Sequence, residues 1–375
     1  MRDLVALDLP GGQAFVTALE RAWDDGDAVA PLDPRLPAPA RAEVLRVLAP
    51  TAVVGTDSER RPLAGGRPVE DGDALVIATS GTTGTPKAAV LTNAAVAASA
   101  EATSARLGVD PRTDRWLACL PLAHVGGLSV VTRALLTGTP LTVHPAFDPD
   151  AAVASGATLV SLVATALDRL DPSAFRVIVL GGSAPPATVP PNAVTTYGLT
   201  ETGSGVVYDG RPLDGVDVRI AADGEVQVRG PMLLRAYRDG TDPKDAAGWL
   251  ATGDVGRLDE GRLVVEGRRD DMIVTGGENV WPETVERVLA GTPGVFDVAV
   301  AGELDAEWGQ RVVAYVVAVE PVPSLSALRE RVKEALPAWC APRRLVFVES
   351  LPRTALGKVR RDQLTARTPA PPSIT

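Results

Sequence analysis

The chain has 375 residues, of which 45% are hydrophobic, and its formal net charge at pH 7 is −10. A chain this long exceeds the usual size of one hydrophobic core, which predicts two domains and excludes global disorder. The negative balance disfavours nucleic acid as a partner, although a local group of arginines can still bind a small anion.

The first part of the chain changes its pattern near residue 74. Residues 1–70 combine short helical patterns with Pro-rich connections, and no signal peptide is expected in them. The apolar run 74–78 then predicts a strand, followed by a Gly/Thr-rich loop and a helix over 93–108. Further short apolar strands are predicted in 115–122, 140–144, 157–163 and 175–182. Alternating strands and helices favour an α/β sheet with crossover connections, whose ligand loops follow the carboxyl ends of strands.

Beyond residue 210 the pattern becomes one of hairpins. Strand pairs are predicted in 216–230 and 256–268, with Asp-Gly and Glu-Gly turns. The remainder predicts a compact α+β module, which makes a separate domain. Its predicted elements are helices at 282–290 and 324–336 and strands at 295–303, 310–319 and 344–349. The predicted organisation is an N-terminal domain 1–267, a hinge 268–270, a mobile C-terminal domain 271–365 and a disordered tail 366–375.

The two cysteines and the apolar runs bear on the compartment. Cys119 and Cys340 lie far apart without metal-ligand spacing, which predicts free buried thiols in a reducing compartment. No apolar run has the length of a membrane span, so a cytoplasmic protein without membrane insertion is expected. With only two histidines in the chain, a His-based metal site is disfavoured.

The segment TSGTTGTPKAAV, residues 79–90, has two readings. It can be a surface turn, or a phosphate cradle in which small residues expose backbone N–H groups and Lys87 adds charge. It is not a Walker A motif, because Pro86 precedes Lys87 and Ala88 follows it.

The loop resembles the phosphate loop Ser-Gly-Thr-Thr-Gly-x-Pro-Lys of the adenylate-forming acyl- and aryl-CoA synthetases. Four more segments follow in that family's order. They are LGGSAPP (180–186), TYGLTETG (196–203), the stretch 249–286 with TGD, GRRDD and TGGEN, and LPRTALGKVRR (351–361). Each has an ordinary reading alone: a strand-to-turn signal, a polar helix start with Thr–Glu capping, a hairpin with a solvated Arg/Asp run, and a solvated basic tail. Their shared order favours the family.

The resemblance implies the fold and the reactants. It implies a large N-terminal α/β domain of the adenylate-forming type, a small mobile C-terminal α+β domain, and ATP, Mg²⁺, coenzyme A and a small carboxylic acid as reactants. The residues implied to bind ATP or AMP are Thr79, Ser80, Gly81, Thr82, Thr83, Gly84, Lys87, Gly181, Gly182, Ser183, Tyr197, Gly198, Thr200, Asp254 and Arg268.

The resemblance also implies individual roles. Tyr197 would stack on adenine, Thr200 would contact the α-phosphate and Glu201 would hold Mg²⁺. Asp254 would accept hydrogen bonds from the ribose hydroxyls, and Arg268 would contact the ribose–phosphate side. The implied catalytic residues are Lys358, Thr200, Lys87 and His124; Asp270 would be the hinge, and Gly276 and Gly277 would face the CoA arm.

The segment 120–138, LPLAHVGGLSVVTRALLTG, bears on the acid. It resembles the corresponding stretch of o-succinylbenzoate–CoA ligases of menaquinone biosynthesis, with His124 in the signature position and Arg133 nine residues later. Ala123 stands where many relatives have an aromatic residue, which would widen the pocket. Arg133 either holds the acid's retained carboxylate, or caps a helix or pairs with a surface acid. His124 can equally be a structural histidine, and the segment 159–167 with Ser161 either lines the acyl pocket or belongs to the core.

The implied function is an ATP-dependent acid–CoA ligase acting on o-succinylbenzoate. The alternatives are another aryl- or fatty-acyl-CoA ligase of the family, and a non-catalytic nucleotide-binding relative, which the intact motif residues disfavour. The first seventy residues show no family motif and are shorter than in most members, which affects surface packing and the contacts of an expected homo-oligomer.

Overall fold

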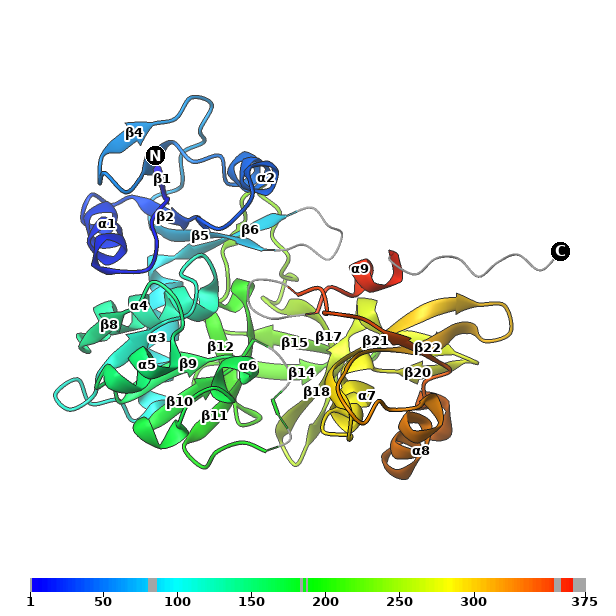
Figure 1. Ribbon diagram of the computed structural model, residues 1–375. Coiled ribbons are helices and arrows are strands. Elements are labelled where there is room, and N and C mark those ends of the chain that lie inside the picture. Colours follow the sequence, from blue (N-terminus) through cyan, green and yellow to red (C-terminus); the bar gives the residue numbers. More distant parts are fainter. Residues whose placement is uncertain (1, 80–85, 183–184, 187, 354–358, 367–375) are drawn as a thin grey trace. The chain divides into compact units, whose positions relative to one another are not determined.

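The structure is a computed structural model, and it describes residues 2–79, 86–182, 185–186, 188–353 and 359–366. The chain divides into two compact units, which we call the N-terminal and C-terminal units (Figure 1). Within the described residues, no helix combines the length and apolarity that a membrane crossing requires. The N-terminal unit comprises 1–219, 227–252 and 260–263, and the C-terminal unit comprises 220–226, 253–259 and 264–375.

The first sheet of the N-terminal unit contains strands that the sequence pattern did not predict. Its inner strands β1, β2 and β3 come from residues 1–70, where only helical patterns and Pro-rich connections were expected. They are three or four residues long, and β1 and β2 are buried throughout, so they show no alternation of apolar and polar residues. In spatial order the strands are β16 (Ala236–Tyr237), β6 (Lys87–Thr92), β5 (Asp73–Thr79), β2 (Ala28–Pro31), β1 (Leu4–Leu7), β3 (Ala52–Val54) and β4 (Arg60–Pro62).

Strand β6 is a second difference from the prediction. The residues after the Gly/Thr loop pair antiparallel with β5, and Thr79 lies opposite Lys87. Helix α3 (Asn93–Leu107), which confirms the predicted helix, begins only after β6, where the Thr92 hydroxyl accepts a hydrogen bond from the Ala95 amide at 3.1 Å. The loop therefore connects two strands, and the N-terminus of α3 is not available to a phosphate bound there.

The second sheet has the parallel arrangement expected of an α/β domain. Its strands β7, β8, β9, β10 and β11 pair in parallel, and β12 and β13 add antiparallel strands at one edge. The strands are shorter than the apolar runs that predicted them, because several run ends continue into turns. In spatial order they are β13 (Arg211–Pro212), β12 (Ser204–Tyr208), β11 (Ala193–Leu199), β10 (Val177–Leu180), β9 (Leu159–Leu162), β7 (Trp116–Ala118) and β8 (Leu141–Val143).

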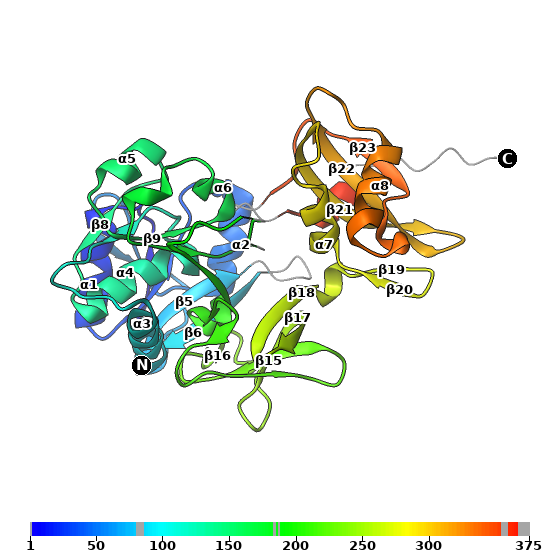
Figure 2. The same cartoon turned by 90° about the horizontal axis from the view of Figure 1, so that it is seen from below.

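Helices cover these sheets and separate them. Helix α3 packs on β5, β6 and β12, and α4 (Val125–Thr137) packs on α3 and on β7, β8 and β9, so this helix pair contacts both sheets (Figure 2). Apolar side chains from the second sheet and its helices form a continuous core around Leu117, Val160 and Ile178. The other helices are α1 (Gln13–Asp24), α2 (Ala38–Leu48), α5 (Pro149–Ala154), α6 (Ala164–Leu167) and the 3-10 turns η1 (Pro172–Ala174) and η2 (Thr200–Thr202).

The remaining strands form a four-stranded and a five-stranded sheet. The four-stranded sheet has the order β14 (Asp217–Ile220), β15 (Glu225–Arg229), β17 (Leu250–Asp259), β18 (Arg262–Arg268), as the hairpin signals predicted. The boundary between the two units runs through these strands. The five-stranded sheet has the order β20 (Glu278–Val280), β19 (Ile273–Thr275), β22 (Gly309–Ala318), β21 (Val295–Asp305), with β23 (Arg344–Phe347) paired to β22.

The helices of the C-terminal unit lie on both faces of its five-stranded sheet. Helices α7 (Pro282–Leu289) and α8 (Leu325–Ala335), which match the two predicted helices, pack on one face around Val300 and Val312. Helix α9 (Arg361–Ala366) contacts β21, and its Leu364 belongs to the apolar cluster on the other face. Two 3-10 turns complete the unit, η3 (Arg269–Asp271) and η4 (Ala338–Cys340).

Candidate active site

Lys87 stands at the start of β6, at the end of the Gly/Thr loop. Its ammonium lies 4.8 Å from the ring centroid of Tyr237 on β16. The phenol of Tyr237 in turn donates a hydrogen bond to Oε1 of Glu201 at 3.0 Å. The fold thus brings together two predicted site residues that lie 114 positions apart in the sequence, through a third residue that the sequence did not indicate. The predicted loop residues Ser80, Gly81, Thr82, Thr83 and Gly84 lie outside the described residues, as does Ser183.

The two predicted adenine-binding segments meet at the carboxyl ends of β10 and β11. These strands pair in parallel, with Leu180 opposite Thr195, so Gly181 and Tyr197 follow at the same edge of the sheet. A side chain at Gly181 would meet the Thr196 hydroxyl at 2.6 Å, and one at Gly198 would meet the Ser204 carbonyl at 2.2 Å. The backbone clash requires glycine at position 198, the Thr196 hydroxyl would have to turn away from a side chain at position 181, and Gly182 adopts φ +84°.

Thr200 and Glu201 lie in the tight turn η2 between β11 and β12. The Thr202 hydroxyl accepts a hydrogen bond from the Leu199 amide at 2.8 Å and donates to the Ser204 carbonyl at 2.6 Å, which fixes the turn. Neither the Thr200 nor the Glu201 side chain is fully buried, so both are accessible to a ligand. The predicted Thr–Glu helix start is a 3-10 turn of three residues.

The donor set at this turn suits Mg²⁺ bound through a nucleotide. Across the described part of the chain, no three His, Cys, Asp or Glu side chains are grouped so as to hold a metal. One carboxylate with a neighbouring hydroxyl is instead the arrangement that Mg²⁺ uses when substrate phosphates and water supply its other ligands. Glu201 fits this use, because Tyr237 accounts for one lone pair of Oε1 and the carboxylate has about four.

The predicted ribose ligands, Asp254 and Arg268, pair with one another in the C-terminal unit. Asp254 on β17 is 5% exposed, and Oδ1 accepts a hydrogen bond from Nη1 of Arg268 at 3.1 Å. Gly253, with φ +73°, lies against the Arg268 guanidinium. The pair holds the carboxylate in a defined orientation, and a carboxylate has further lone pairs for hydroxyl donors.

The predicted CoA-facing glycines form the two-residue turn of a hairpin. Gly276 and Gly277 join β19 and β20, with φ of +61° and +84°, as such a turn requires. The Gly276 amide donates to the Trp308 carbonyl at 2.9 Å, and a side chain at Gly276 would collide with the Trp308 ring. The turn thus has no room for a side chain at position 276.

The structure describes the predicted hinge residue but not the predicted catalytic lysine. Asp270 lies in η3, directly after β18, where the chain leaves the four-stranded sheet. Lys358 lies outside the described residues. Its flanks are described: Arg353 bridges to Val359, and the Arg360 amide donates to the Pro352 carbonyl at 2.8 Å.

His124 is the residue before α4, and Arg133 lies within that helix. His124 is partly buried; burial lowers the pKa of its imidazole, against the opposing effect of the Asp33 carboxylate. Its Nε2 finds no hydrogen-bond partner among the described residues. A side chain at Gly127 would collide with the carbonyls of Leu120 and Pro121, so α4 begins in close contact with the preceding turn.

Arg133 is a fully enclosed cation. It is 2% exposed, donates from Nη2 to the Ser204 hydroxyl at 3.1 Å and stacks 4.9 Å from the Trp116 ring centroid. Its partners are therefore a hydroxyl and an aromatic ring rather than the surface acid or helix end of the alternative reading. Its Nε and Nη1 have no acceptor among the described residues, and burial lowers the pKa of the guanidinium.

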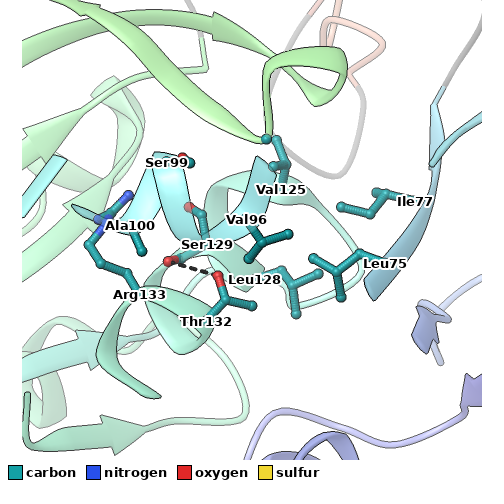
Figure 3. A pocket seen from close by; sticks show the side chains of 11 residues that line it. Leu75, Ile77, Val96, Ser99, Ala100, Val125, Leu128, Ser129, Thr132 and Arg133 are labelled. Atoms are coloured by element: carbon teal, nitrogen blue, oxygen red, sulfur yellow. Dashed lines mark hydrogen bonds between the residues drawn. The ribbon is translucent and has the colours of Figure 1, made fainter. Parts of the chain in front are cut away.

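A small cavity adjoins Arg133 (Figure 3). Its volume is about 10 Å³, the room of about one water molecule. A carboxylate group is larger than this, so the lining side chains must move apart before an acid could reach the guanidinium. Among its lining residues are Leu75, Ile77, Val96, Val125, Leu128 and Ser129.

Ser161 and the cysteines belong to the interior. Ser161 on β9 is 8% exposed and pairs with Val179, while Leu162, Ala166 and Leu167 join the core of the second sheet. Cys119 and Cys340 are free and buried, as predicted. Burial raises the pKa of the Cys119 thiol to about 12, which leaves it unreactive at neutral pH.

A buried ionic cluster ties α9 to the turn η3 and to α7. The Arg361 guanidinium lies 2.8 Å from Glu286, 3.1 Å from Glu283 and 3.3 Å from Asp271. Burial raises the pKa of Glu286 to about 7, although Arg361 and the Val300 amide favour its carboxylate form. No sequence signal indicated this cluster, because its members are spread over ninety positions.

The raised pKa of Glu286 makes stability depend on pH. Glu286 holds its proton more tightly in the folded chain than in the unfolded chain. Its contribution to the free energy of unfolding is therefore complete below about pH 4.5 and is lost as the pH rises through about 7. In Glu286→Gln this loss is absent. The free energy of unfolding of the variant relative to the parent should therefore rise by about 3 kcal/mol between pH 4.5 and 8. Urea unfolding at both pH values measures this, and parallel pH profiles would contradict it.

Comparison with known proteins assigns the chain to a class. The model of the AMP-binding enzyme family matches residues 56–238, and that of the AMP-binding enzyme C-terminal domain matches 284–358. The chain belongs to the AMP-binding enzyme family, and the predicted fold class is confirmed.

Two curated relatives are similar over most of the chain. The probable 2-succinylbenzoate–CoA ligase of Mycobacterium tuberculosis (strain ATCC 25618 / H37Rv) is 41% identical, with 84% of this chain and 91% of that protein covered. The 2-succinylbenzoate–CoA ligase of Bacillus anthracis (strain A0248) is 37% identical, with 77% of this chain and 69% of that protein covered.

A solved structure extends the likeness to almost the whole chain. It is the o-succinylbenzoate CoA synthetase (MenE) of Bacillus subtilis in complex with the acyl-adenylate intermediate OSB-AMP, with TM-score 0.86 and 30% identity, covering 96% of this chain and 88% of that one. Since the uncovered 4% is much shorter than seventy residues, most of residues 1–70 has a counterpart there. The region shares the fold of this structure although its short buried strands carry no family motif.

Proposed function

We propose that the chain is an acid–CoA ligase that activates o-succinylbenzoate with ATP and transfers it to coenzyme A, a step of menaquinone biosynthesis. The observation that carries the choice of acid is the enclosed guanidinium of Arg133, which has two donor positions without an acceptor among the described residues. A dicarboxylic acid would supply the missing acceptor once the side chains lining the small cavity move apart, because one carboxylate reacts and the other remains. The similarity to 2-succinylbenzoate–CoA ligases supports the same acid.

The first half-reaction would join the acid to AMP. A carboxylate oxygen attacks the α-phosphorus of ATP, the bond to the β-phosphate oxygen breaks, and pyrophosphate leaves. Thr200 and Lys87 would hold phosphate oxygens, Lys358 would bridge the carboxylate and the α-phosphate, and His124 would border the acid. Glu201 would hold Mg²⁺, which neutralises phosphate charge. No covalent intermediate with the protein is required, since positioning and charge stabilisation carry the step.

The second half-reaction would form the thioester. The CoA sulfur attacks the acyl carbon, the bond to the AMP oxygen breaks, and AMP leaves as the thiol proton is lost. Rotation about Asp270 would remove Lys358 and present the Gly276–Gly277 turn to the CoA arm. Tyr197 with Gly181 and Gly182 would hold adenine, and Asp254 with Arg268 would hold the ribose.

The compartment is proposed from the reactants, and the assembly only from the family resemblance. ATP and CoA are supplied in the cytoplasm, so we place the enzyme there, with a homo-oligomer as the expected assembly. Sedimentation at micromolar concentration measures the assembly.

Replacing Arg133 tests the assignment of the acid. In Arg133→Leu the contact to the retained carboxylate is lost, which should lower kcat/KM for o-succinylbenzoate about ten- to a hundred-fold. KM for ATP should stay nearly unchanged. The preference for the diacid over its methyl ester at the retained carboxylate should narrow, because the ester lacks the second charge. Steady-state kinetics with both compounds measures this.

Controls separate the pocket from general effects. Arg169→Leu also removes an arginine stacked on a ring, 5.4 Å from the Phe147 centroid, but at an exposed position. It should leave kcat/KM for o-succinylbenzoate and KM for ATP unchanged. If Arg133→Leu discriminates diacid from ester as well as the parent does, Arg133 is not the carboxylate anchor. A parent enzyme that prefers benzoate or a medium-chain acid would favour the other ligase assignment, and one without ATP–pyrophosphate exchange on any acid would favour the non-catalytic alternative.

A further inference from the structure

Tyr237 contacts two residues to which the proposed reaction assigns roles. It lies on β16 opposite Ala89 of β6, so its side chain and that of Lys87, two residues along β6, share a face of the sheet. Its ring faces the Lys87 ammonium at 4.8 Å, and its hydroxyl donates to Oε1 of Glu201 at 3.0 Å. The Leu234 amide donates to the Glu201 carbonyl at 2.7 Å, so the backbones of the two segments are also joined.

The backbone of Tyr237 is held by the residue after it. Arg238 is 8% exposed, and its amide donates to the Ala88 carbonyl at 2.8 Å. Its guanidinium donates to carbonyls at the end of α2 and in the connection between β4 and β5. These acceptors are the carbonyls of Leu48, Ala49, Arg67 and Pro68. Moving this segment would leave buried charged donors unpaired, which costs more than an ordinary hydrogen bond. The backbone of Tyr237 is therefore held in place, so its side chain can orient the residues that it contacts.

We propose that Tyr237 is a positioning residue for the MgATP site, which orients Glu201 toward the metal and Lys87 toward the phosphates; this rests on the proposed function. Its O–H occupies one lone pair of the Glu201 carboxylate and so sets the direction of the others, as partners of metal-binding carboxylates do. Its ring attracts the Lys87 ammonium without neutralising it, which keeps the full positive charge available to phosphate.

Tyr237→Phe removes the O–H and keeps the ring. The Mg²⁺ concentration that gives half-maximal ATP–pyrophosphate exchange should rise about ten-fold. Thioester formation from supplied acyl-adenylate and CoA, in which ATP takes no part, should stay at the parent rate. Tyr237→Leu also removes the ring and should in addition raise KM for ATP, because Lys87 loses its support.

A second readout does not depend on turnover. Binding of Mn²⁺ in the presence of ATP, followed by electron paramagnetic resonance without any acid, should weaken in Tyr237→Phe by a similar factor. The matched control is Tyr315→Phe in the C-terminal unit, which deletes the same kind of bond, from Tyr315 to Oε1 of Glu303 at 2.9 Å. It should leave Mn²⁺ binding and the Mg²⁺ dependence unchanged.

The outcomes distinguish this inference from the proposed function. An unchanged Mg²⁺ dependence and unchanged Mn²⁺ binding in Tyr237→Phe overturn it, as does an equal loss of both half-reactions with a lowered melting temperature. If the parent enzyme prefers another acid, only the substrate assignment fails, and the exchange test proceeds with that acid. If no acid supports exchange, the proposed function fails, and the Mn²⁺·ATP measurement alone decides for or against Tyr237.

Discussion

Lys358→Ala should lower the rate of acyl-adenylate formation by about 10²–10³-fold, the loss expected when one stabiliser of developing charge is removed. The lysine belongs to the segment LPRTALGKVRR, and the described residues on both sides of it are joined by the bridge from Arg353 to Val359. Thioester formation from supplied acyl-adenylate should stay close to the parent rate, because in the proposed mechanism the lysine takes no part in that step. Pyrophosphate release and CoA-dependent thioester formation, measured separately, provide the comparison.

Lys333→Ala is the control for this variant. Lys333 lies on the surface of α8, paired with Glu330 at 2.8 Å, and its loss should change neither half-reaction. Equal losses of both half-reactions in Lys358→Ala would mean that the lysine does not have the assigned role.

Asp270→Pro should give the complementary defect. Asp270 lies in η3, between β18 and β19, and proline there fixes φ and removes an N–H. Adenylation should continue while the rotation that we propose to follow it is impeded. Acyl-adenylate should accumulate on the enzyme, and thioester formation should fall on the order of a hundred-fold, since the CoA sulfur is no longer placed for attack. Rapid quenching and chromatography of the bound adenylate measure the accumulation.

Asp270→Ala separates the backbone effect from the loss of the side chain. It removes the carboxylate without restricting φ, and it should retain most of the thioester-forming rate. An Asp270→Pro enzyme with normal overall turnover would place the hinge at another residue.

The amino-acid sequence by itself determined the family and most of the local structure. Contiguous signals were sufficient for this: the order of the motif segments, the helical patterns of α3, α7 and α8, and the hairpin turns of the four-stranded sheet. Gly276 and Gly277 illustrate the reason, because a two-residue turn with positive φ at both positions has a signature that is local in sequence.

Other elements were decided by tertiary pairing. Strands β1, β2 and β3 are too short to show a period, and they exist because neighbouring strands satisfy their backbone groups. Strand β6 carries the end of a Gly/Thr-rich loop, and its pairing with β5 and β16 makes it a strand. The local sequence of β6 does not indicate that β5 and β16 will pair with it.

For the candidate site, too, the sequence indicated some features and only the structure showed the others. The sequence motifs identified Lys87, Glu201 and Arg133 as candidate site residues, but they did not predict which side chains surround them. The enclosure of Arg133 against Trp116 and Ser204, the contact of Tyr237 with Lys87 and Glu201, and the burial that raises the pKa of Glu286 all join residues distant in sequence. Burial and hydrogen bonding are properties of the packed chain, so only the tertiary structure could decide them.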